Sequence, residues 1–329
     1  MYFTVKDPYR QAIEAASGGR NTVMYDDKGY PSVLVCVPKF NMEDVASDIG
    51  TGVHPMFIHH GKELPEIWIG KYTGKIVNGR MCSVPMEDPT AYVTYDTTRD
   101  ACTAKGKGWH LMSRAEWAGL ALYCAKAGFV PRGNTATGKA HDATYEHGVM
   151  GGDGRTLTGS GPNSWSHDGT AAGIMDLCGN IWEWNQGMKI IDGRIYVVGE
   201  DGTVMNNFDT ADSEKSTAGY IDTGDFYQNA STIATAAAST QGGYEGAFSS
   251  IAAASGVTPH AALKQLALMK STDVTTDDHF WVNTDGERVP IAGGNWHYGS
   301  YAGLFALHLA DVRGYSCDSI GGRVAYAEI

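Results

Sequence analysis

The residues best suited to chemistry lie near the C-terminal end of the chain, in GGNWHYGSYAGLFALHLADVRGYSCDSIGGR, residues 293–323. Tyrosine, histidine, aspartate and cysteine follow one another there without the period of a helix or a strand. His297 and His308 could ligate a metal, but no carboxylate stands at a matching spacing, which favours surface histidines. Cys317 has no partner cysteine in the stretch and cannot run a dithiol cycle. These residue types suit non-covalent contact with a ligand.

Other residue types with catalytic potential are also explained without catalysis. Ser166, His167 and Asp168 are adjacent, whereas the members of a catalytic triad converge from separate parts of a chain, so we expect a loop there. The cysteines lie far apart and form no Cys-x-x-Cys pair, which disfavours a zinc site or a dense disulfide framework. We therefore expect free thiols at Cys36, Cys82, Cys102, Cys124, Cys178 and Cys317.

Composition excludes several classes of partner. With 329 residues and 43% hydrophobic content, the chain can bury a large core. A net charge of -12 without clustered Lys or Arg argues against nucleic acid or an anionic membrane as the main partner. The first residues lack the features of a signal peptide, and no apolar run approaches the length of a membrane span. We expect synthesis in the cytoplasm and no membrane insertion.

The first fifty residues predict a small α/β module. Asp7-Pro8 begins a helix that runs through Ala16 and can end at Gly18, because proline suits the first turn and glycine the left-handed cap. Two β runs follow at 22–25 and 32–37, joined by a polar turn. A unit of this size rarely stands alone, so we interpret residues 1–50 as a docking or oligomerisation module.

Residues 51–205 and 280–329 predict a compact, loop-rich α+β domain. Ser113 and Glu116 form a capping box that begins a helix ending at Gly128. The Asp-Gly pair in MKIIDGRIYVV predicts a hairpin with a type I′ turn. Residues 206–279 look like an insertion that is partly helical, with a helix in VTPHAALKQLALMKS capped by Thr258 and with Pro259 at its first position.

Three ordered blocks resemble the formylglycine-generating enzyme (sulfatase-modifying factor) family, a variant of the C-type lectin fold. The blocks are HLMSRAEWAGLALYCAKAG, GIMDLCGNIWEWNQG and VPIAGGNWHYGS with GGRVAY, and the resemblance spans residues 54–205 and 280–329. It implies an α+β, C-type lectin-like fold of the formylglycine-generating-enzyme type, with buried tryptophans in the turn at 179–184. The scaffold residues it implies are Trp182, Trp184, Gly294, Trp296, Gly322 and Arg323.

Whether the chain is an enzyme depends on a missing pair of cysteines. The enzymes resembled here carry redox cysteines just after the segment that corresponds to 294–303, and this chain has none there. We therefore expect no catalytic residues and no required cofactor. Two alternatives stay open: an oxidase or transferase of the same fold with an atypical site, and a calcium-dependent lectin, in which Asn180 and Glu183 could hold a structural calcium.

The final stretch also resembles the variable region of proteins diversified by retroelements, which share this fold. There, mutagenesis at adenines of AAC-type codons never yields Lys, Glu, Gln, Met or Trp, and none of these types occurs from His297 to Ser319. Residues 293–323 are thus a candidate variable region, in which Leu307 and Leu309 point inward and their neighbours outward. The candidate variable, ligand-binding positions are His297, Tyr298, Tyr301, Ala306, His308, Ala310, Asp311, Gly314, Tyr315, Cys317 and Asp318.

The resemblance implies a receptor-binding protein. Variable proteins of this kind, encoded by phages and prophages, present a diversified surface on a rigid domain, and such a surface resembles an antibody paratope. The implied partner is a protein or glycan on a host cell, and the implied place is the tip of a phage tail in the virion. A homo-oligomer would raise a weak single-site affinity through avidity.

Overall fold

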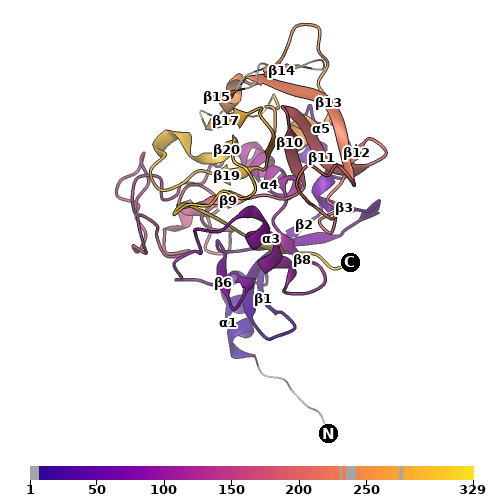
Figure 1. The fold of residues 1–329 in the computed structure, drawn as a ribbon. Helices are drawn as coiled ribbons and strands as arrows, with labels where there is room; N and C mark the ends of the chain where they lie inside the picture. The colour runs from indigo at the N-terminus through magenta and orange to yellow at the C-terminus, as the bar shows by residue number, and fades with distance from the viewer. Residues whose placement is uncertain (1–6, 230–231, 235–241, 273, 275, 277) are drawn as a thin grey trace.

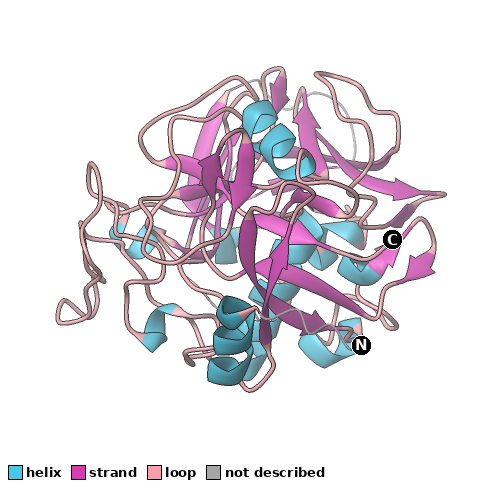
Figure 2. Cartoon of the chain, turned by 90° about the horizontal axis from the view of Figure 1, so that it is seen from below, coloured by secondary structure: helices cyan, strands magenta, loops and turns pink. Residues whose placement is uncertain are grey.

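The computed structural model describes residues 7–229, 232–234, 242–272, 274, 276 and 278–329. Strands and long loops make up most of the molecule and helices are short, which confirms the α+β class (Figure 2). The helices of this part are α1 (Pro8–Ser17), α2 (Met42–Val45), α3 (Tyr95–Thr103), α4 (Arg114–Ala127) and α5 (Ala262–Gln265), with 3-10 turns η1 (Pro55–Phe57), η2 (Asn163–Trp165), η3 (Phe248–Ser250) and η4 (Gly299–Tyr301).

One sheet joins the N-terminal segment to the end of the chain. Its strand order is β1-β2-β5-β22-β8, with bounds Asn21–Tyr25, Pro31–Pro38, Glu66–Gly70, Val324–Tyr326 and Trp109–Leu111. The predicted helix before it is confirmed as α1, because Asp7 caps its first turn and Gly18 adopts the left-handed conformation at its end. Strands β1 and β2 of the N-terminal segment therefore share a sheet with strands from later parts of the chain (Figure 1).

A second sheet extends from the predicted hairpin into the predicted insertion. Its order is β16-β14-β13-β11-β10-β18, with β12 also paired to β11. Asp192 (φ 50°) and Gly193 (φ 83°) form the turn between β10 and β11, which confirms the type I′ prediction. The bounds are Ala252–Ala253 (β16), Thr232–Ala234 (β14), Tyr220–Asn229 (β13), Arg194–Glu200 (β11), Met188–Ile191 (β10), Glu287–Arg288 (β18) and Thr203–Val204 (β12).

A third sheet contains the strands of residues 293–323, the candidate variable region. Its order is β15-β17-β20-β19-β9-β21, and β20 pairs in parallel with β17 and antiparallel with β19. Two strand pairs outside these sheets are β3 with β4 (Ile58–His59, Lys62–Glu63) and β6 with β7 (Lys75–Val77, Arg80–Cys82). The bounds in the third sheet are Gly243–Ala247 (β15), His279–Asn283 (β17), Gly303–Leu309 (β20), Ile291–Gly293 (β19), Trp182–Trp184 (β9) and Ile320–Gly322 (β21).

Helix α4 lies in the middle of the molecule and supports the third sheet from one side (Figure 1). The Ser113–Glu116 capping box and the Gly128 cap are both confirmed. Trp117 of α4 packs in the main core with Leu307 and Leu309 of β20, and its Nε1 donates to the backbone oxygen of Leu304 at 2.8 Å. One face of β20 is thus fixed by the core, as the alternation predicted.

The helix predicted in residues 257–271 is wrong in extent. Only α5, four residues long, is helical there, and Ala261 rather than Thr258 precedes it. Just after α5, Nε and Nη2 of the buried Arg114 donate to the backbone oxygens of Leu266 and Ala267 at 2.8 and 3.1 Å. Ala267 also takes a positive φ of 47°, which breaks the helical path.

Other features of the described chain bear on the sequence predictions. All six cysteines lie in this part and are free thiols. Trp165, in the long loop before β9, is fully buried. Among the described residues, the helices are too short or too polar to cross a bilayer.

Candidate binding surface

Three aromatic side chains from adjacent strands form the floor of a candidate site. Trp182 of β9, Trp281 of β17 and His308 of β20 point to the face of the third sheet that lies away from α4. Trp281 is paired in register with His308, and their ring centroids lie 5.5 Å apart. The Trp182 ring lies 5.7 Å from Trp281 and 5.8 Å from His308. The sheet therefore holds these rings at fixed positions.

Two tyrosines from the segment before β20 cover this floor. The ring of Tyr298 lies 5.4 Å from both Trp182 and Trp281, edge-on to each. The ring of Tyr301 lies 4.3 Å from that of His279 and is 50% exposed. We call the group Trp182, His279, Trp281, Tyr298, Tyr301 and His308 the aromatic surface.

Tight backbone packing positions the tyrosines. Gly294 has a φ of 84°, and a Cβ there would lie 2.4 Å from the Cβ of Ala302, so only glycine fits. The amide of Gly299 donates to the backbone oxygen of Thr135 at 2.9 Å, and Trp296 just before is buried. Residues 294–302 are thus bonded to a neighbouring loop through their backbone. Tyr298 and Tyr301 can therefore be substituted without moving the backbone.

Burial shifts the pKa values of two side chains of the aromatic surface. Partial burial and the nearby Asp311 carboxylate raise the pKa of the Tyr298 hydroxyl, so it is neutral at pH 7. Burial lowers the pKa of His279, which is therefore an uncharged imidazole at that pH. Within the described chain, Nε2 of His279 and Nδ1 of His308 are buried without a hydrogen-bond partner, although Glu245 and Asp311 oxygens lie 3.9 and 3.2 Å away.

The loop after β20 is anchored by a charged residue that the sequence analysis did not single out. Arg313 donates to both carboxylate oxygens of Glu287 at 2.9 and 2.8 Å and to Asp96 at 3.0 Å. Its partners raise the pKa of this guanidinium above its already high ordinary value. Close by, Tyr315 is 45% exposed and interacts with the side chain of Cys317. Arg313 therefore fixes the loop after β20, while Tyr315 of the same loop is partly exposed to solvent.

Most of the predicted variable positions are brought near the aromatic surface. The His297 ring lies 5.1 Å from that of Tyr298, and Asp311 contacts His308. Tyr315 lies close enough to Cys317 and Tyr298 for both groups to raise the pKa of its hydroxyl, and Cys317 also contributes to the raised pKa of Tyr298. The members of this group are His297, Tyr298, Tyr301, His308, Asp311, Tyr315 and Cys317.

The other predicted positions lie elsewhere. The expected exposure of Ala306 is wrong: it lies on the side of β20 opposite Leu307 and Leu309, but it is fully buried there, in the second core with Trp182 and Trp184. Ala310 is half-buried. Gly314 is exposed and borders a separate hollow with Lys215 and Arg288. Asp318 lies at the edge, where its backbone oxygen accepts a 2.7 Å bond from Arg155.

Sequence reasoning missed the contribution of the strands beside β20. Trp281, His279 and Glu245 belong to β17 and β15, and Nε1 of Trp281 donates to Glu245 at 2.9 Å. The alternation Phe280, Trp281, Val282 carried a signal, because Phe280 and Val282 are buried in the main core and Trp281 must then face the opposite way.

The scaffold tryptophans and the candidate calcium residues are buried together. Trp182 and Trp184 are 3% and 0% exposed, as predicted. The Glu183 carboxylate accepts from Arg323 at 2.6 and 2.9 Å, and Oδ1 of Asn180 accepts from the amide of Thr156 at 2.8 Å. A calcium ion here would have to displace these bonds.

Comparison with known proteins gives only distant likenesses. No family model matches the chain, and no curated protein matches it. PvdO from Pseudomonas aeruginosa is 16% identical with a TM-score of 0.39, and the match covers 93% of this chain and 98% of that one. Treponema denticola variable protein 1 is 11% identical with a TM-score of 0.39, and the match covers 94% of this chain and 99% of that one. A Major Tropism Determinant P3c variant is 12% identical with a TM-score of 0.36, and the match covers 93% of this chain and 71% of that one. Likenesses this weak do not assign the chain to any of their families or functions.

Proposed function

We propose that this chain is a ligand-binding protein of C-type lectin-like architecture, whose contact surface is the aromatic surface together with the exposed side chains of 297–318. The observation that carries the proposal is the gathering of these rings on one face of the third sheet, from β9, β17, β20 and the segment at 298–301. Aromatic side chains supply contact area at low entropic cost and dominate binding energy at interfaces.

The arrangement also suits diversification. Core packing and backbone bonds fix β20 and residues 294–302, while Tyr301 and Tyr315 are about half exposed. Substitution of exposed side chains changes stability by only about 0.5 kcal/mol, so many sequences can occupy this surface on one scaffold. We propose that a retroelement generates this variation, that the ligand is a protein or glycan on a host cell, and that the chain acts in homo-oligomers at a phage tail tip.

Binding rather than catalysis is favoured by the sequence of the site. The segment 294–303 contains no cysteine, and the nearest thiol of the stretch, Cys317, stands alone. The direct test is a binding assay in which the labelled full chain is incubated with a panel of bacterial strains and cell-bound fluorescence is measured. The proposal requires saturable binding to a subset of strains that unlabelled protein displaces. Uniform, non-saturable labelling across the panel would refute it.

Diversification has a separate test at the level of the gene. The coding DNA for residues 293–323 should have a near-copy close by, with adenine in the copy wherever the two differ. If the copies differ at other bases as often as at adenines, the retroelement part of the proposal is wrong, while the binding part is unaffected.

A further inference from the structure

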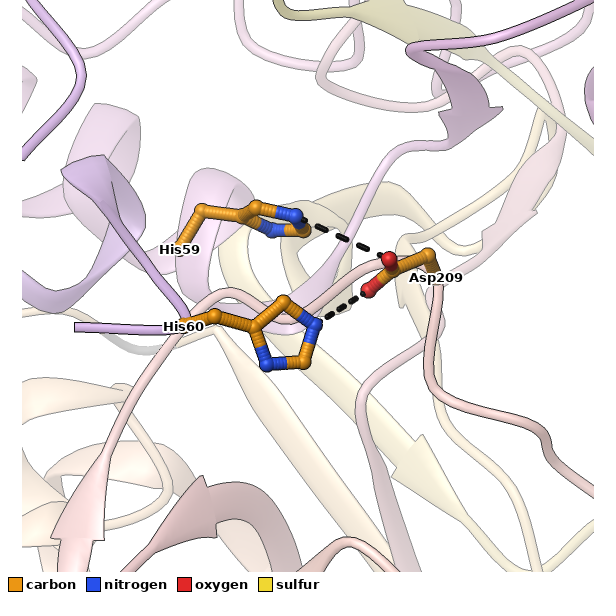
Figure 3. A group of neighbouring side chains, drawn as sticks. All are labelled: His59, His60 and Asp209. Atoms are coloured by element: carbon orange, nitrogen blue, oxygen red, sulfur yellow. Dashed lines mark hydrogen bonds and ion pairs between the residues drawn. The ribbon is translucent and has the colours of Figure 1, made fainter. Parts of the chain in front are cut away.

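Two adjacent histidines and an aspartate meet at a corner of the molecule away from the aromatic surface. His59 ends β3 and His60 follows it in the turn to β4, whereas Asp209 comes from the loop after β12 (Figure 3). Nε2 of His60 lies 2.9 Å from Oδ1 of Asp209, and Nε2 of His59 lies 3.7 Å from Oδ2. The three ligand atoms all lie within 4.8 Å of one another.

The proton position on the His59 ring suits metal ligation. Nδ1 of His59 lies 3.0 Å from the backbone oxygen of Asn206, which only accepts, so this nitrogen carries the hydrogen. In the neutral ring, Nε2 then presents a lone pair toward an oxygen of Asp209 that also only accepts. Two acceptors facing each other are unfavourable unless a proton or a metal cation lies between them.

His60 has the arrangement that often accompanies a metal-bound histidine. Its Nδ1 lies 2.8 Å from Oε1 of Glu200, while its Nε2 faces Asp209. A carboxylate that accepts from the outer nitrogen orients the ring and makes the inner nitrogen a better ligand. Glu200 is itself held by Nδ2 of Asn207 at 3.1 Å, and Oδ1 of Asn207 accepts from the amide of His60 at 2.6 Å.

The surroundings keep the three ligands in place. The side chain of His59 is only 8% exposed and stacks on Phe208, with ring centroids 4.4 Å apart. Phe208 in turn stacks on His110 at 3.8 Å. Nδ2 of Asn206 donates to the backbone oxygen of Met56 and to Glu116, at 3.0 and 2.9 Å. The residues just before Asp209 are therefore held in place by these contacts.

We propose that His59, His60 and Asp209 bind a divalent transition-metal ion of the zinc class. Two imidazole nitrogens and one carboxylate oxygen suit such ions, whereas Ca²⁺ and Mg²⁺ prefer sets made of oxygen alone. The side chains of His60 and Asp209 are 48% and 49% exposed, so a water molecule can complete the coordination from solvent. The ion would link the β3–β4 turn to a loop 149 residues further along the chain.

Zinc titration of the full chain tests the proposal. After treatment with a chelator and buffer exchange, calorimetric titration with ZnCl2 should give one site of micromolar or tighter affinity, and the unfolding temperature should rise with Zn²⁺. CaCl2 and MgCl2 should give no such signal. An absent Zn²⁺ signal overturns the proposal.

Matched variants locate the site. His60→Gln and Asp209→Asn should each weaken Zn²⁺ binding by at least tenfold, whereas His147→Gln, at an exposed histidine in another loop, should bind as the parent does. Circular dichroism checks that each variant folds, and Asp209→Asn, a nearly isosteric change at a half-exposed side chain, serves if His60→Gln does not fold. Equal Zn²⁺ affinity in the parent and all folded variants would place the metal elsewhere and refute the assignment. Because these residues do not belong to the aromatic surface, either outcome leaves the proposed function standing.

Discussion

The buried ion pair between Glu183 and Arg323 allows a direct test of how much this pair contributes to the stability of the folded protein. Arg323 donates to Glu183 at 2.6 and 2.9 Å, and to oxygens of Gly70, Thr73 and Met175 at 2.8, 3.2 and 2.9 Å. The side chains of the pair are 0% and 1% exposed. Arg323→Met removes every one of these bonds and leaves a carboxylate without its counter-charge in the interior.

The expected cost follows from that uncompensated charge. Removing one partner of a buried ion pair lowers the free energy of unfolding by about 3–5 kcal/mol, whereas replacing both partners with apolar residues is often near neutral. Arg323→Met should therefore be destabilised by about 3–5 kcal/mol, and the double variant Arg323→Met with Glu183→Met should be more stable than this single variant. Lys39→Met, which breaks the exposed pair with Glu63, should cost less than about 1 kcal/mol.

Urea unfolding followed by tryptophan fluorescence measures all of these variants. The reasoning would be refuted if Arg323→Met unfolded within about 1 kcal/mol of the parent, since a buried carboxylate cannot lose its partner at so small a cost. It would also be refuted if the double variant were less stable than Arg323→Met, because replacing Glu183 should remove the uncompensated charge that destabilises the single variant.

Two further predictions concern the core. Burial raises the pKa of Asp176 from 3.8 to about 6, and its Oδ1 has no hydrogen-bond partner in the described chain, so the folded state binds this proton more tightly than the unfolded state. The stability that this group contributes is present in full below about pH 4 and is lost as the pH rises through about 6. Asp176→Asn should therefore stabilise the protein at pH 7.5 by at most about 3 kcal/mol and should flatten the pH dependence of stability, measured by urea unfolding from pH 4 to 8. An unchanged pH profile would contradict this prediction. Trp182→Ala should cost about 3–5 kcal/mol in the same assay, the range for a large core aromatic, and a melting temperature equal to the parent's would show that the ring does not support the core.

Local signals in the sequence predicted much of the fold because they depend on neighbouring residues only. The cap at Asp7, the capping box at Ser113 and the Asp192-Gly193 turn each satisfy backbone geometry within a few residues, and the structure has all three. The helix predicted around 257–271 was wrong in extent: Ala267 takes a positive φ, and Arg114, distant in the sequence, binds the backbone oxygens of Leu266 and Ala267. No pattern within that segment contains this information.

The candidate site was predictable only in part for the same reason. Alternation along β20 placed Leu307 and Leu309 inside, but it could not reveal that Ala306 faces a second core rather than solvent. The contribution of Trp281 depends on β17 pairing in parallel with β20, a long-range choice. His59, His60 and Asp209 meet only because the loop after β12 folds back on the β3–β4 turn, and neither segment alone carries a metal-binding spacing.

The central claim is that exposed tyrosines of residues 297–318 supply the binding energy, and one comparison tests it most directly. The dissociation constants of the parent, Tyr301→Ala, Tyr315→Ala and Tyr123→Ala would be measured on a bacterial strain that binds the parent. Tyr123 is 46% exposed on α4, on the other side of the core, and serves as the control. The two site variants should each weaken binding by about 2 kcal/mol, roughly thirtyfold, with little change in melting temperature, while the control binds as the parent does. Unchanged affinity in both site variants, or an equal loss in Tyr123→Ala, would contradict the claim.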